Sequence, residues 1–470
     1  MPAVTTAVWG DEECEVALAA ACRVLEEAGV DAPQGEALAL LAGAGAPAEG
    51  HRVRVPRALV EAALLSAPRS FALPGRGKGG MVLEQGNTYF GTGPDCVYVH
   101  APAGGERRRA RLDDVVQSAA LCDRLDQVDF VMSMALPGEA PIDSDDLLQF
   151  AAMLEGTTKP IVVSTSHGAD GLEAMVEMAG LCGEERSFAC LVMASPPVRF
   201  DADALAKLIG CARLGVPVVL APAPSAGATA PASMSSAIVV GHAEMLAGLV
   251  VHQLAAPGAP FVYGAGASAL DMRVALDPYV GPDHFLANQA ACDLARHHDL
   301  PSWSYAGTSD AKSLDEQWSA DVAITSLLGA LSRATLLHDL GYMESGMAGS
   351  PDSIVLGAEM AGFARSFLRD LPVDEEALQL EEIIGVGPGG NHLGRPYTRK
   401  HHRDLWRSDL FDHAAFDRWH TDGRTTLRER VSRRTQELLA QPPDHAVTAS
   451  ARARFEQLIA SVAAGRRERS

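Results

Sequence analysis

The sequence predicts an α/β fold: a (β/α)8 barrel, the TIM-barrel architecture, with an N-terminal extension of helices and β-hairpins and a C-terminal helical tail. From Leu112 onward, helical patterns alternate with short, almost continuously apolar runs that end in small or polar residues. Such runs, joined by helical crossovers, are typical of parallel strands that are covered on both faces. Eight such units over about 250 residues fit a closed barrel, and a doubly wound open sheet is the alternative.

The expected strands are the apolar runs themselves. The first seven are 128–134, 160–164, 189–194, 217–221, 261–263, 302–305 and 335–338, and a weaker eighth is 353–356. In a barrel of this kind, ligands bind where the strands end at their carboxyl side. The residues that follow these runs are therefore the first candidates for a functional site.

The chain is expected to have three parts. These are the N-terminal extension at 1–111, the barrel at 112–372, and a glycine loop with helices that pack on the barrel at 373–470. In the extension, helices are predicted at 11–28 and from Pro56 to Ser66, because proline is well placed in the first turn of a helix. Turn signals predict two hairpins, which pair 81–83 with 88–90 and 96–99 with 106–109.

Composition and charge argue against several classes of protein. The 470 residues include 39 basic and 60 acidic side chains, and the resulting net charge of −21 argues against nucleic acid as a partner. The most apolar long stretch, 237–256, contains His242, Glu244 and His252, so we expect a buried helix and no membrane span. The eight cysteines include no CxxC pair and the N-terminus has no charged-then-apolar signal segment, which favours a cytoplasmic protein.

A glycine-dense segment at 385–394 follows a helical pattern at 374–384 and includes Pro388. A phosphate-binding loop needs a strand before it and free backbone amides, so we do not interpret this segment as one. We expect it to be a turn that carries the chain past the last strand. Such a turn would bring Asn391 and His392 to the barrel mouth.

Three polar residues at strand ends are the candidate catalytic groups. His338 and Glu344 lie at and after the seventh run, and Asp310 follows the sixth. A carboxylate at a strand end can act as an acid, a base or a counter-charge to a cationic substrate. The alternatives are a rim salt bridge for Glu344 and a helix cap for Asp310. His338 and His167 have no neighbouring ligands at metal-binding spacing, so no metal site is expected.

Three tyrosines also end strands: Tyr263, Tyr305 and Tyr342. Aromatic rings around a barrel mouth can hold a quaternary ammonium group through cation–π attraction of roughly 1–2 kcal/mol for each favourable ring. Ordinary core packing is the alternative for each ring. We expect these tyrosines, together with His167, to bind substrate.

Several segments match one family in the same order along the chain. They are 55–71 with its Ser66-Ala67-Pro68-Arg69-Ser70-Phe71, Gly91-Thr92-Gly93, Lys159-Pro160, 227–231, 244–248, Ser309-Asp310-Ala311-Lys312, 341–346 and 385–391. This ordered set resembles the trimethylamine/quaternary-amine methyltransferase family in its form that lacks pyrrolysine. The resemblance covers roughly residues 50–440.

The resemblance implies an enzyme that moves a methyl group from a quaternary amine, glycine betaine or a related betaine, to the Co(I) of a corrinoid. A separate partner protein would carry the corrinoid, and this chain itself would bind no cofactor. On this hypothesis Asn391, His392 and Arg395 line the mouth and meet a substrate carboxylate or the corrinoid protein. We also expect a homo-oligomer. A non-catalytic betaine-binding protein, or a barrel hydrolase or lyase with Asp310 and His338 as acid and base, are the alternatives.

Overall fold

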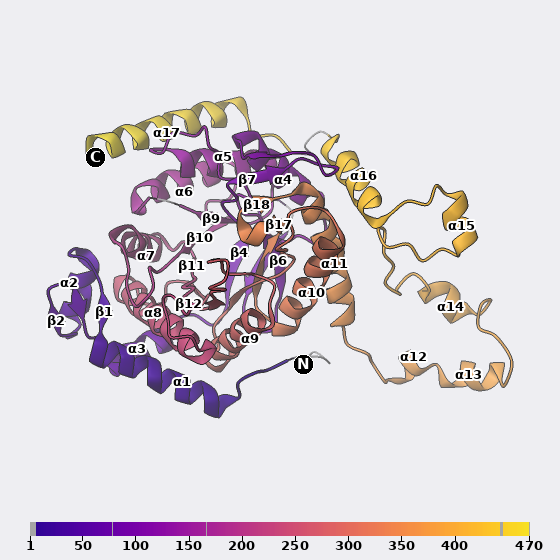
Figure 1. Cartoon of the computed structure of the whole chain (residues 1–470), viewed down its shortest axis with the longest axis horizontal. Helices are drawn as coiled ribbons and strands as arrows, with labels where there is room; N and C mark the ends of the chain where they lie inside the picture. Colours follow the sequence, from indigo (N-terminus) through magenta and orange to yellow (C-terminus); the bar gives the residue numbers. More distant parts are fainter. Residues whose placement is uncertain (1–5, 78, 166, 442–444, 470) are drawn as a thin grey trace.

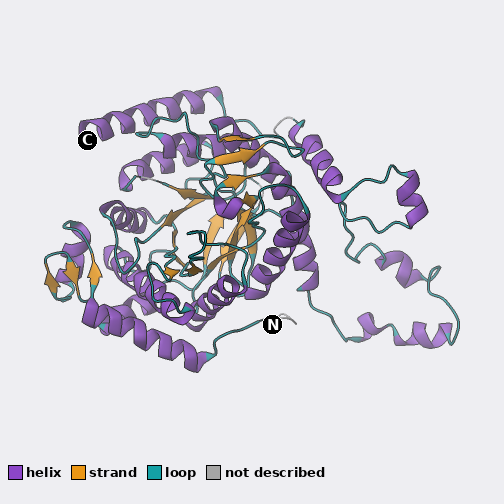
Figure 2. Ribbon diagram, in the orientation of Figure 1, coloured by secondary structure: helices purple, strands orange, loops and turns teal. Residues whose placement is uncertain are grey.

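A ring of parallel strands lies inside a ring of helices in the computed structural model, which describes residues 6–77, 79–165, 167–441 and 445–469 (Figures 1 and 2). The named strands of the ring are β6 (Tyr89–Thr92), β9 (Ile161–Ser164), β10 (Phe188–Val192), β11 (Val218–Leu220), β13 (Phe261–Tyr263), β15 (Trp303–Tyr305) and β16 (Leu336–Leu340). The segment around Phe130 and Val131 fills the remaining place, between β6 and β9.

Parallel pairing runs around the whole ring. Strands β9, β10, β11 and β13 form one sheet, and β15, β16 and β6 form another. Single parallel bridges join these sheets: Gly91 to Phe130, Val131 to Ile161, and Tyr263 to Ser302. The pairings therefore return to β6, which confirms the predicted (β/α)8 barrel.

A helix follows each position of the ring and covers its outside (Figure 2). These helices are α4 (Leu112–Asp123), α5 (Asp145–Gly156), α6 (Leu172–Leu181), α7 (Ala202–Leu214), α8 (Met234–Ala255), α9 (Pro282–His297), α10 (Glu316–Ser332) and α11 (Pro351–Phe367). Short elements lie between them: η2 (Ala169–Gly171), β12 (Ser225–Ala226), β14 (Ser268–Ala269), β17 (Tyr342–Met343), η3 (Glu344–Gly346) and β18 (Ala348–Gly349).

The predicted eighth strand, 353–356, is wrong, because these residues lie in α11. Ser350 caps that helix by accepting a hydrogen bond from the Ser353 backbone N–H, and Pro351 stands in its first turn. The missing strand is β6, which pairs in parallel with β16. One ring strand thus lies inside the segment that we assigned to the N-terminal extension, and the remaining domain boundaries stay a prediction.

Of the two predicted hairpins, the first is also wrong. Strand β5 (Gly80–Leu83) pairs with β4 (Phe71–Pro74) and not with the run at 88–90, which belongs to β6. The second is confirmed, since β7 (Tyr98–His100) pairs antiparallel with β8 (Arg107–Arg109).

Side chains from alternate strand positions fill the barrel interior. In β9, for example, Val162 belongs to the interior apolar cluster, whereas Ile161 and Val163 belong to the larger cluster between strands and helices. This is the period of two that a pleated strand imposes. The interior residues of the ring are Phe130, Met132, Val162, Ala189, Leu191, Val219, Ala221, Val262, Trp303 and Leu336.

The β4–β5 hairpin closes the amino end of the barrel. Its Leu73, Met81 and Leu83 join the interior cluster and are buried. The chain around the hairpin bonds to residues just before the ring strands: the Arg76 backbone N–H donates to the Thr158 carbonyl, and Gln85 donates to the Leu300 carbonyl. Each such buried apolar side chain contributes about 1.5–3 kcal/mol. The described residues of the hairpin thus cover the amino end of the barrel interior.

The remaining N-terminal elements are α1 (Asp11–Arg23), η1 (Val24–Ala28), β1 (Val30–Asp31), α2 (Glu36–Gly43), β2 (Ala48–Glu49), β3 (Arg52–Val53) and α3 (Arg57–Ser66). Of these, α1, η1, α2 and α3 pack on α8. Helix α8 itself is long and apolar enough to cross a membrane by length and composition, the one such helix in the described residues. However, 72% of its most apolar window is buried inside the protein, as we expected for a core helix.

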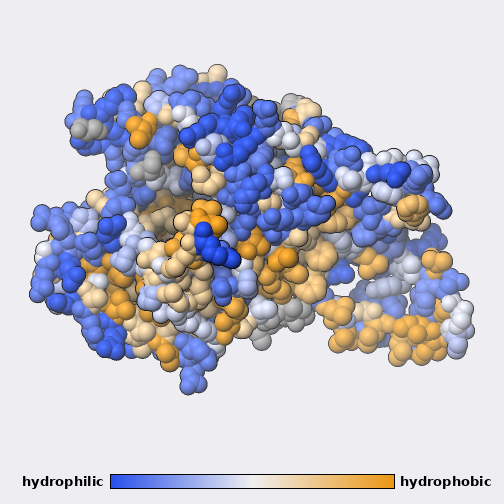
Figure 3. Space-filling view, in the orientation of Figure 1, coloured by the Kyte–Doolittle hydropathy of each residue, from blue (hydrophilic) through white to orange (hydrophobic). Residues whose placement is uncertain are grey.

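The C-terminal part divides into an arm and two packed helices (Figure 1). The arm projects from the barrel and carries α12 (Glu375–Leu378), α13 (Leu380–Val386), α14 (Pro396–His401) and α15 (Phe416–Thr421). Helix α16 (Leu427–Leu439) returns to contact α11 and α4, and α17 (Ala449–Arg469) contacts α5 and α6. The arm presents an apolar surface over α12 and α13, where Leu380, Ile383 and Ile384 are exposed (Figure 3).

Replacing Gly91 by alanine should destabilise the barrel. A Cβ at this position of β6 would lie 2.4 Å from the ring of the buried Phe130. The ring cannot move without disturbing the interior layer, so the free energy of unfolding should fall by about 1–3 kcal/mol. Chemical denaturation measures this loss. Gly43→Ala is the matched control, because no atom lies within 4 Å of a Cβ there, and an equal loss in both variants would contradict the packing argument.

The buried carboxyl of Glu244 should make stability depend on pH. Its Oε1 accepts a hydrogen bond from the Val198 N–H at 2.5 Å, and burial raises its pKa from 4.5 to about 7. A raised folded-state pKa means that the stabilising contribution is complete below about pH 4.5 and is lost as the pH rises to about 7. Relative to Glu244→Gln, the free energy of unfolding of the natural protein should fall by about 3 kcal/mol across this range. Parallel pH-dependent slopes for the two proteins would refute this assignment.

Candidate active site

A cavity of about 330 Å³ lies at the carboxyl ends of β10, β11, β13, β15 and β16. Its lining includes the interior side chains Leu191, Ala221 and Trp303, which therefore form its floor. Met193, two positions beyond Leu191, also lines it and is 46% exposed. The cavity therefore reaches from the interior layer of the barrel to the surface.

Six aromatic rings line the cavity. The Trp303 ring stacks on that of His338 with centroids 4.2 Å apart. A second series runs from Tyr305 to His284 at 4.6 Å, from His284 to Tyr279 at 5.7 Å, and from Tyr279 to Tyr342 at 6.5 Å. Such walls stabilise a cation by presenting the negative faces of their rings.

Burial keeps the polar ends of these rings uncharged. It raises the pKa of Tyr279, Tyr305 and Tyr342 above the ordinary value, so their hydroxyls stay protonated. It also lowers the pKa of His284 to about 4, which leaves a neutral imidazole at neutral pH. The aromatic wall itself therefore carries no charge from these four groups.

Two carboxylates supply the negative charge of the cavity. Asp339 is 2% exposed and has a φ of 80°, at the point where the pairing of β16 with β6 shifts register. Its Oδ1 makes close contact with Nδ1 of His338 but has no hydrogen-bond partner in the described structure. Asp277 accepts a hydrogen bond from the Ser225 hydroxyl at 2.7 Å. Among the described residues that line the cavity there is no lysine or arginine.

Gly93 makes room for this arrangement. A Cβ at Gly93 would lie 2.4 Å from the Tyr342 ring and 2.5 Å from the Asp339 carboxylate. The Tyr342 hydroxyl also donates a hydrogen bond to the carbonyl of Pro94, which fixes the ring against the loop after β6. The loop after β6 thus helps to place both the acid and one ring of the wall.

Of the sequence-predicted site residues, His338, Tyr305 and Tyr342 line the cavity. Tyr263 does not. It is the outward neighbour of the interior Val262, and its hydroxyl makes a hydrogen bond of 2.9 Å with Nδ1 of the buried His242. The packing alternative describes Tyr263 better than the substrate-binding hypothesis.

Glu344 lies in a separate cleft of about 430 Å³ beside the β7–β8 hairpin. His100 and Arg107 make hydrogen bonds to its carboxylate at 2.8 and 2.9 Å. Burial raises the pKa of Glu344, but these hydrogen bonds outweigh burial and hold the pKa below its ordinary value. The charge of Glu344 is therefore compensated by Arg107, and the structure does not bring it to the aromatic cavity.

Asp310 holds a loop in place and does not line the cavity. Its carboxylate accepts hydrogen bonds from the backbone N–H groups of Tyr279 and Val280 at 3.0 and 2.9 Å, and from the Ser345 hydroxyl at 2.7 Å. Through Tyr279 it positions one ring of the wall. The acid–base pair of Asp310 with His338 that a hydrolase would need is not assembled.

The remaining predicted residues lie outside the cavity. Nε2 of His167 contacts the Ile142 carbonyl at 2.6 Å and Asp145 at 3.3 Å. The glycine segment does not reach the barrel mouth, because it lies in the projecting arm (Figure 1). There Asn391 is exposed, and His392 and Arg395 both face Glu382, at 3.2 and 3.8 Å.

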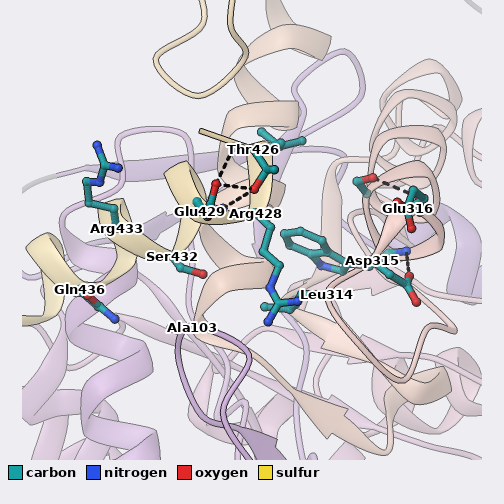
Figure 4. A pocket seen from close by; sticks show the side chains of 13 residues that line it. Ala103, Leu314, Asp315, Glu316, Thr426, Arg428, Glu429, Ser432, Arg433 and Gln436 are labelled. Carbon is teal, nitrogen blue, oxygen red and sulfur yellow. Dashed lines mark hydrogen bonds between the residues drawn. The ribbon is translucent and has the colours of Figure 1, made fainter. Parts of the chain in front are cut away.

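A larger cleft of about 800 Å³ lies between the start of α10 and α16 (Figure 4). Its lining is mostly charged and polar, and Thr426 and Glu429 in it are engaged in the capping box of α16. It is on the outside of the helix ring, whereas barrel sites form at strand ends. The aromatic cavity is the better candidate.

Sequence reasoning missed five residues of the cavity: Asp277, Tyr279, His284, Trp303 and Asp339. The signal for Trp303 was present, since it stands two positions before Tyr305 in the same strand and must share its face. Asp339 follows His338 directly, but the register shift that turns it inward has no sequence signature. Asp277 and Tyr279 come from the long connection between β13 and α9, and His284 lies in the first turn of α9, where no strand periodicity guides a prediction.

Fold and site together define a (β/α)8-barrel protein with a candidate site for a small cation at the carboxyl ends of its strands. Comparison with known families is more specific. The profile described as trimethylamine methyltransferase (MTTB) matches residues 2–466. The chain belongs to this methyltransferase family.

Characterised relatives resemble the chain over most of its length. The glycine betaine methyltransferase of Desulfitobacterium hafniense (strain Y51) is 28% identical over 449 residues, which cover 93% of each chain. The trimethylamine methyltransferase MttB of Methanosarcina thermophila is 31% identical over 373 residues, 74% of each chain. The crystal structure of the monomethylamine methyltransferase MtmB of Methanosarcina barkeri superimposes with a TM-score of 0.50 at 12% identity. It covers 92% of this chain and 87% of MtmB, and it supports the fold alone.

Substituting Asp310 by alanine should loosen the loop that carries Tyr279. Two partly buried backbone N–H groups would lose their acceptor, so the free energy of unfolding should fall by about 1–3 kcal/mol. Thermal denaturation measures the loss, and quenching of ring fluorescence in the cavity reports the loop. Ser345→Ala is the matched control, since it removes one hydrogen bond to Asp310 but leaves both backbone bonds intact. Equal stability of both variants would exclude this role for Asp310.

Proposed function

We propose that this protein takes a methyl group from a quaternary amine and transfers it to the Co(I) of a corrinoid that a separate partner protein carries. The observation that carries the proposal is the aromatic cavity with two carboxylates and no lysine or arginine among its described lining residues. The similarity to a glycine betaine methyltransferase supports it, because glycine betaine is a quaternary amine. A cytoplasmic location and assembly as a homo-oligomer remain predictions.

The chemistry fits a site that binds and orients. A quaternary nitrogen is already positively charged, so its departing amine is neutral and needs no proton. The C–N bond breaks, its electron pair stays on nitrogen, and the methyl group passes to the cobalt. Co(I) supplies the nucleophile, so this chain needs no nucleophile of its own. The protein contributes by positioning the donor and by managing its charge.

Different residues bind the methyl groups and supply the negative potential. The faces of Trp303, Tyr305 and Tyr279 pack against the methyl groups, each favourable ring contributing about 0.5–2 kcal/mol. Asp339 and Asp277 provide the negative potential that holds the ammonium. The exposed rim at Met193 leaves the donor accessible from the carboxyl end of the barrel, where the cobalt must approach.

Removing the Trp303 ring from the floor of the cavity should slow methyl transfer. With reduced cobalamin, a cognate corrinoid protein and a quaternary amine, Trp303→Leu should lower kcat/KM at least about tenfold, since it removes a cation–π contact and packing area. The change in cobalamin absorbance on methylation measures the rate. Trp419→Leu, in the projecting arm, should leave the rate within about twofold of the natural protein.

The non-catalytic alternative makes the opposite prediction. It expects a quaternary amine to raise the thermal midpoint of the protein with no methylation of cobalt, even when the corrinoid protein is present. That result would refute the enzyme proposal. Methylation that does not require the amine would refute it as well.

A further inference from the structure

Among the described residues, the cavity lining carries two acidic side chains and no permanently positive one. Asp339 lies within its wall and Asp277 lies where the loop after β14 meets it. Two basic side chains of the neighbouring cleft are engaged there: Arg107 binds Glu344, and Lys312 donates to the carbonyl of Asp310. Arg273 pairs with Asp271 at the exposed tip of the same loop. In the part of the chain that the structure describes, no permanent positive charge lines the cavity.

A substrate carboxylate would find no suitable place at the floor, the wall or the loop of this cavity. Directed at the floor, it would meet Leu191, Ala221 and the Trp303 ring, where burial of an unpaired charge is costly. Directed at the wall or loop, it would meet Asp339 or Asp277 and be repelled by a like charge. The two orientations fail for different physical reasons.

Neutral donors do not replace the missing cation. The side-chain N–H₂ of Asn288 is engaged with the carbonyls of Ala267 and His284, so this residue presents its acceptor oxygen. His284 is a neutral imidazole, because burial lowers its pKa to about 4. The hydroxyls of Ser268 and Ser304 carry no charge. Apart from His338, which contacts Asp339, these side chains would offer a carboxylate only neutral hydrogen bonds, against two aspartates.

We propose that the methyl donor is a quaternary ammonium ion whose fourth substituent is neutral, so that the donor carries a net charge of +1 and is not a betaine zwitterion. The inference rests on the proposed function and narrows its substrate class. Asp277 and Asp339 are the residues that determine this specificity. Both attract the ammonium, and both repel a carboxylate that is tied to it through a short chain.

Equilibrium binding tests the charge preference without the corrinoid. Tetramethylammonium and choline represent the cations, and glycine betaine and carnitine represent the zwitterions. By calorimetry, the cations should bind at least about tenfold more tightly, consistent with removal of one close like-charge contact. Equal or tighter binding of glycine betaine would overturn the inference.

Substitutions of Asp277 and Asp339 test whether these two residues cause the preference for cations over zwitterions. Asp277→Asn should narrow the ratio of cation to zwitterion affinity by at least about threefold, because one repelling charge is lost. Asp339→Asn should narrow it as well, and circular dichroism will show whether either variant is folded. Asp271→Asn is the matched control, since Asp271 lies in the same loop and does not line the cavity. A ratio unchanged in both cavity variants would overturn the assignment.

Cobalamin methylation separates this inference from the proposed function. Turnover of choline or tetramethylammonium and not of glycine betaine supports both. Turnover of glycine betaine alone leaves the proposed function intact and overturns the charge preference. Tight binding of the cations with no methylation from any donor overturns the proposed function and supports the charge preference of the cavity.

Discussion

The alternation of side chains along a closed ring of strands governs both the stability and the site of this protein. Each ring strand sends every second residue inward, and the ring offers interior space for few of them. Below, the β4–β5 hairpin seals that space with Leu73, Met81 and Leu83. Above, the same alternation ends in Trp303 and Tyr305. The alternation of side chains along each strand therefore determines which side chains stabilise the core and which are available to a ligand.

The alternation also explains how much could be predicted from the sequence. Seven of the apolar runs coincide with ring strands or bridges, because runs buried on both faces are apolar throughout. Strand β6 was mistaken for half of a hairpin, since Tyr89–Thr92 follows a strong turn signal at Gly86 and contains Gly91. The run at 353–356 was mistaken for a strand because the start of a buried helix is apolar too.

The candidate site was less predictable than the fold. Counting alternate positions along each strand distinguishes the outward Tyr263, next to the interior Val262, from Tyr305, which shares the inward face with Trp303. Strand alternation does not apply to Tyr279, which lies in a long connection and whose backbone N–H bonds to the distant Asp310, or to His284, which lies in the first turn of α9. The glycine segment misled for a different reason: its turn residues show that the chain bends, but not toward which surface. Only the tertiary structure places it in the arm.

The position of Asp339 connects the strained backbone to the charge of the site. A non-glycine residue with a φ of 80° costs of order 1–3 kcal/mol, and a buried carboxylate without a hydrogen bond at Oδ1 adds a desolvation cost. Gly93 has no Cβ, and this leaves room for the Asp339 carboxylate. Neither cost improves the packing of the barrel. On the proposed function, a cation at the aromatic wall would offset both costs, because the acid would then gain a counter-charge in a medium that screens it poorly.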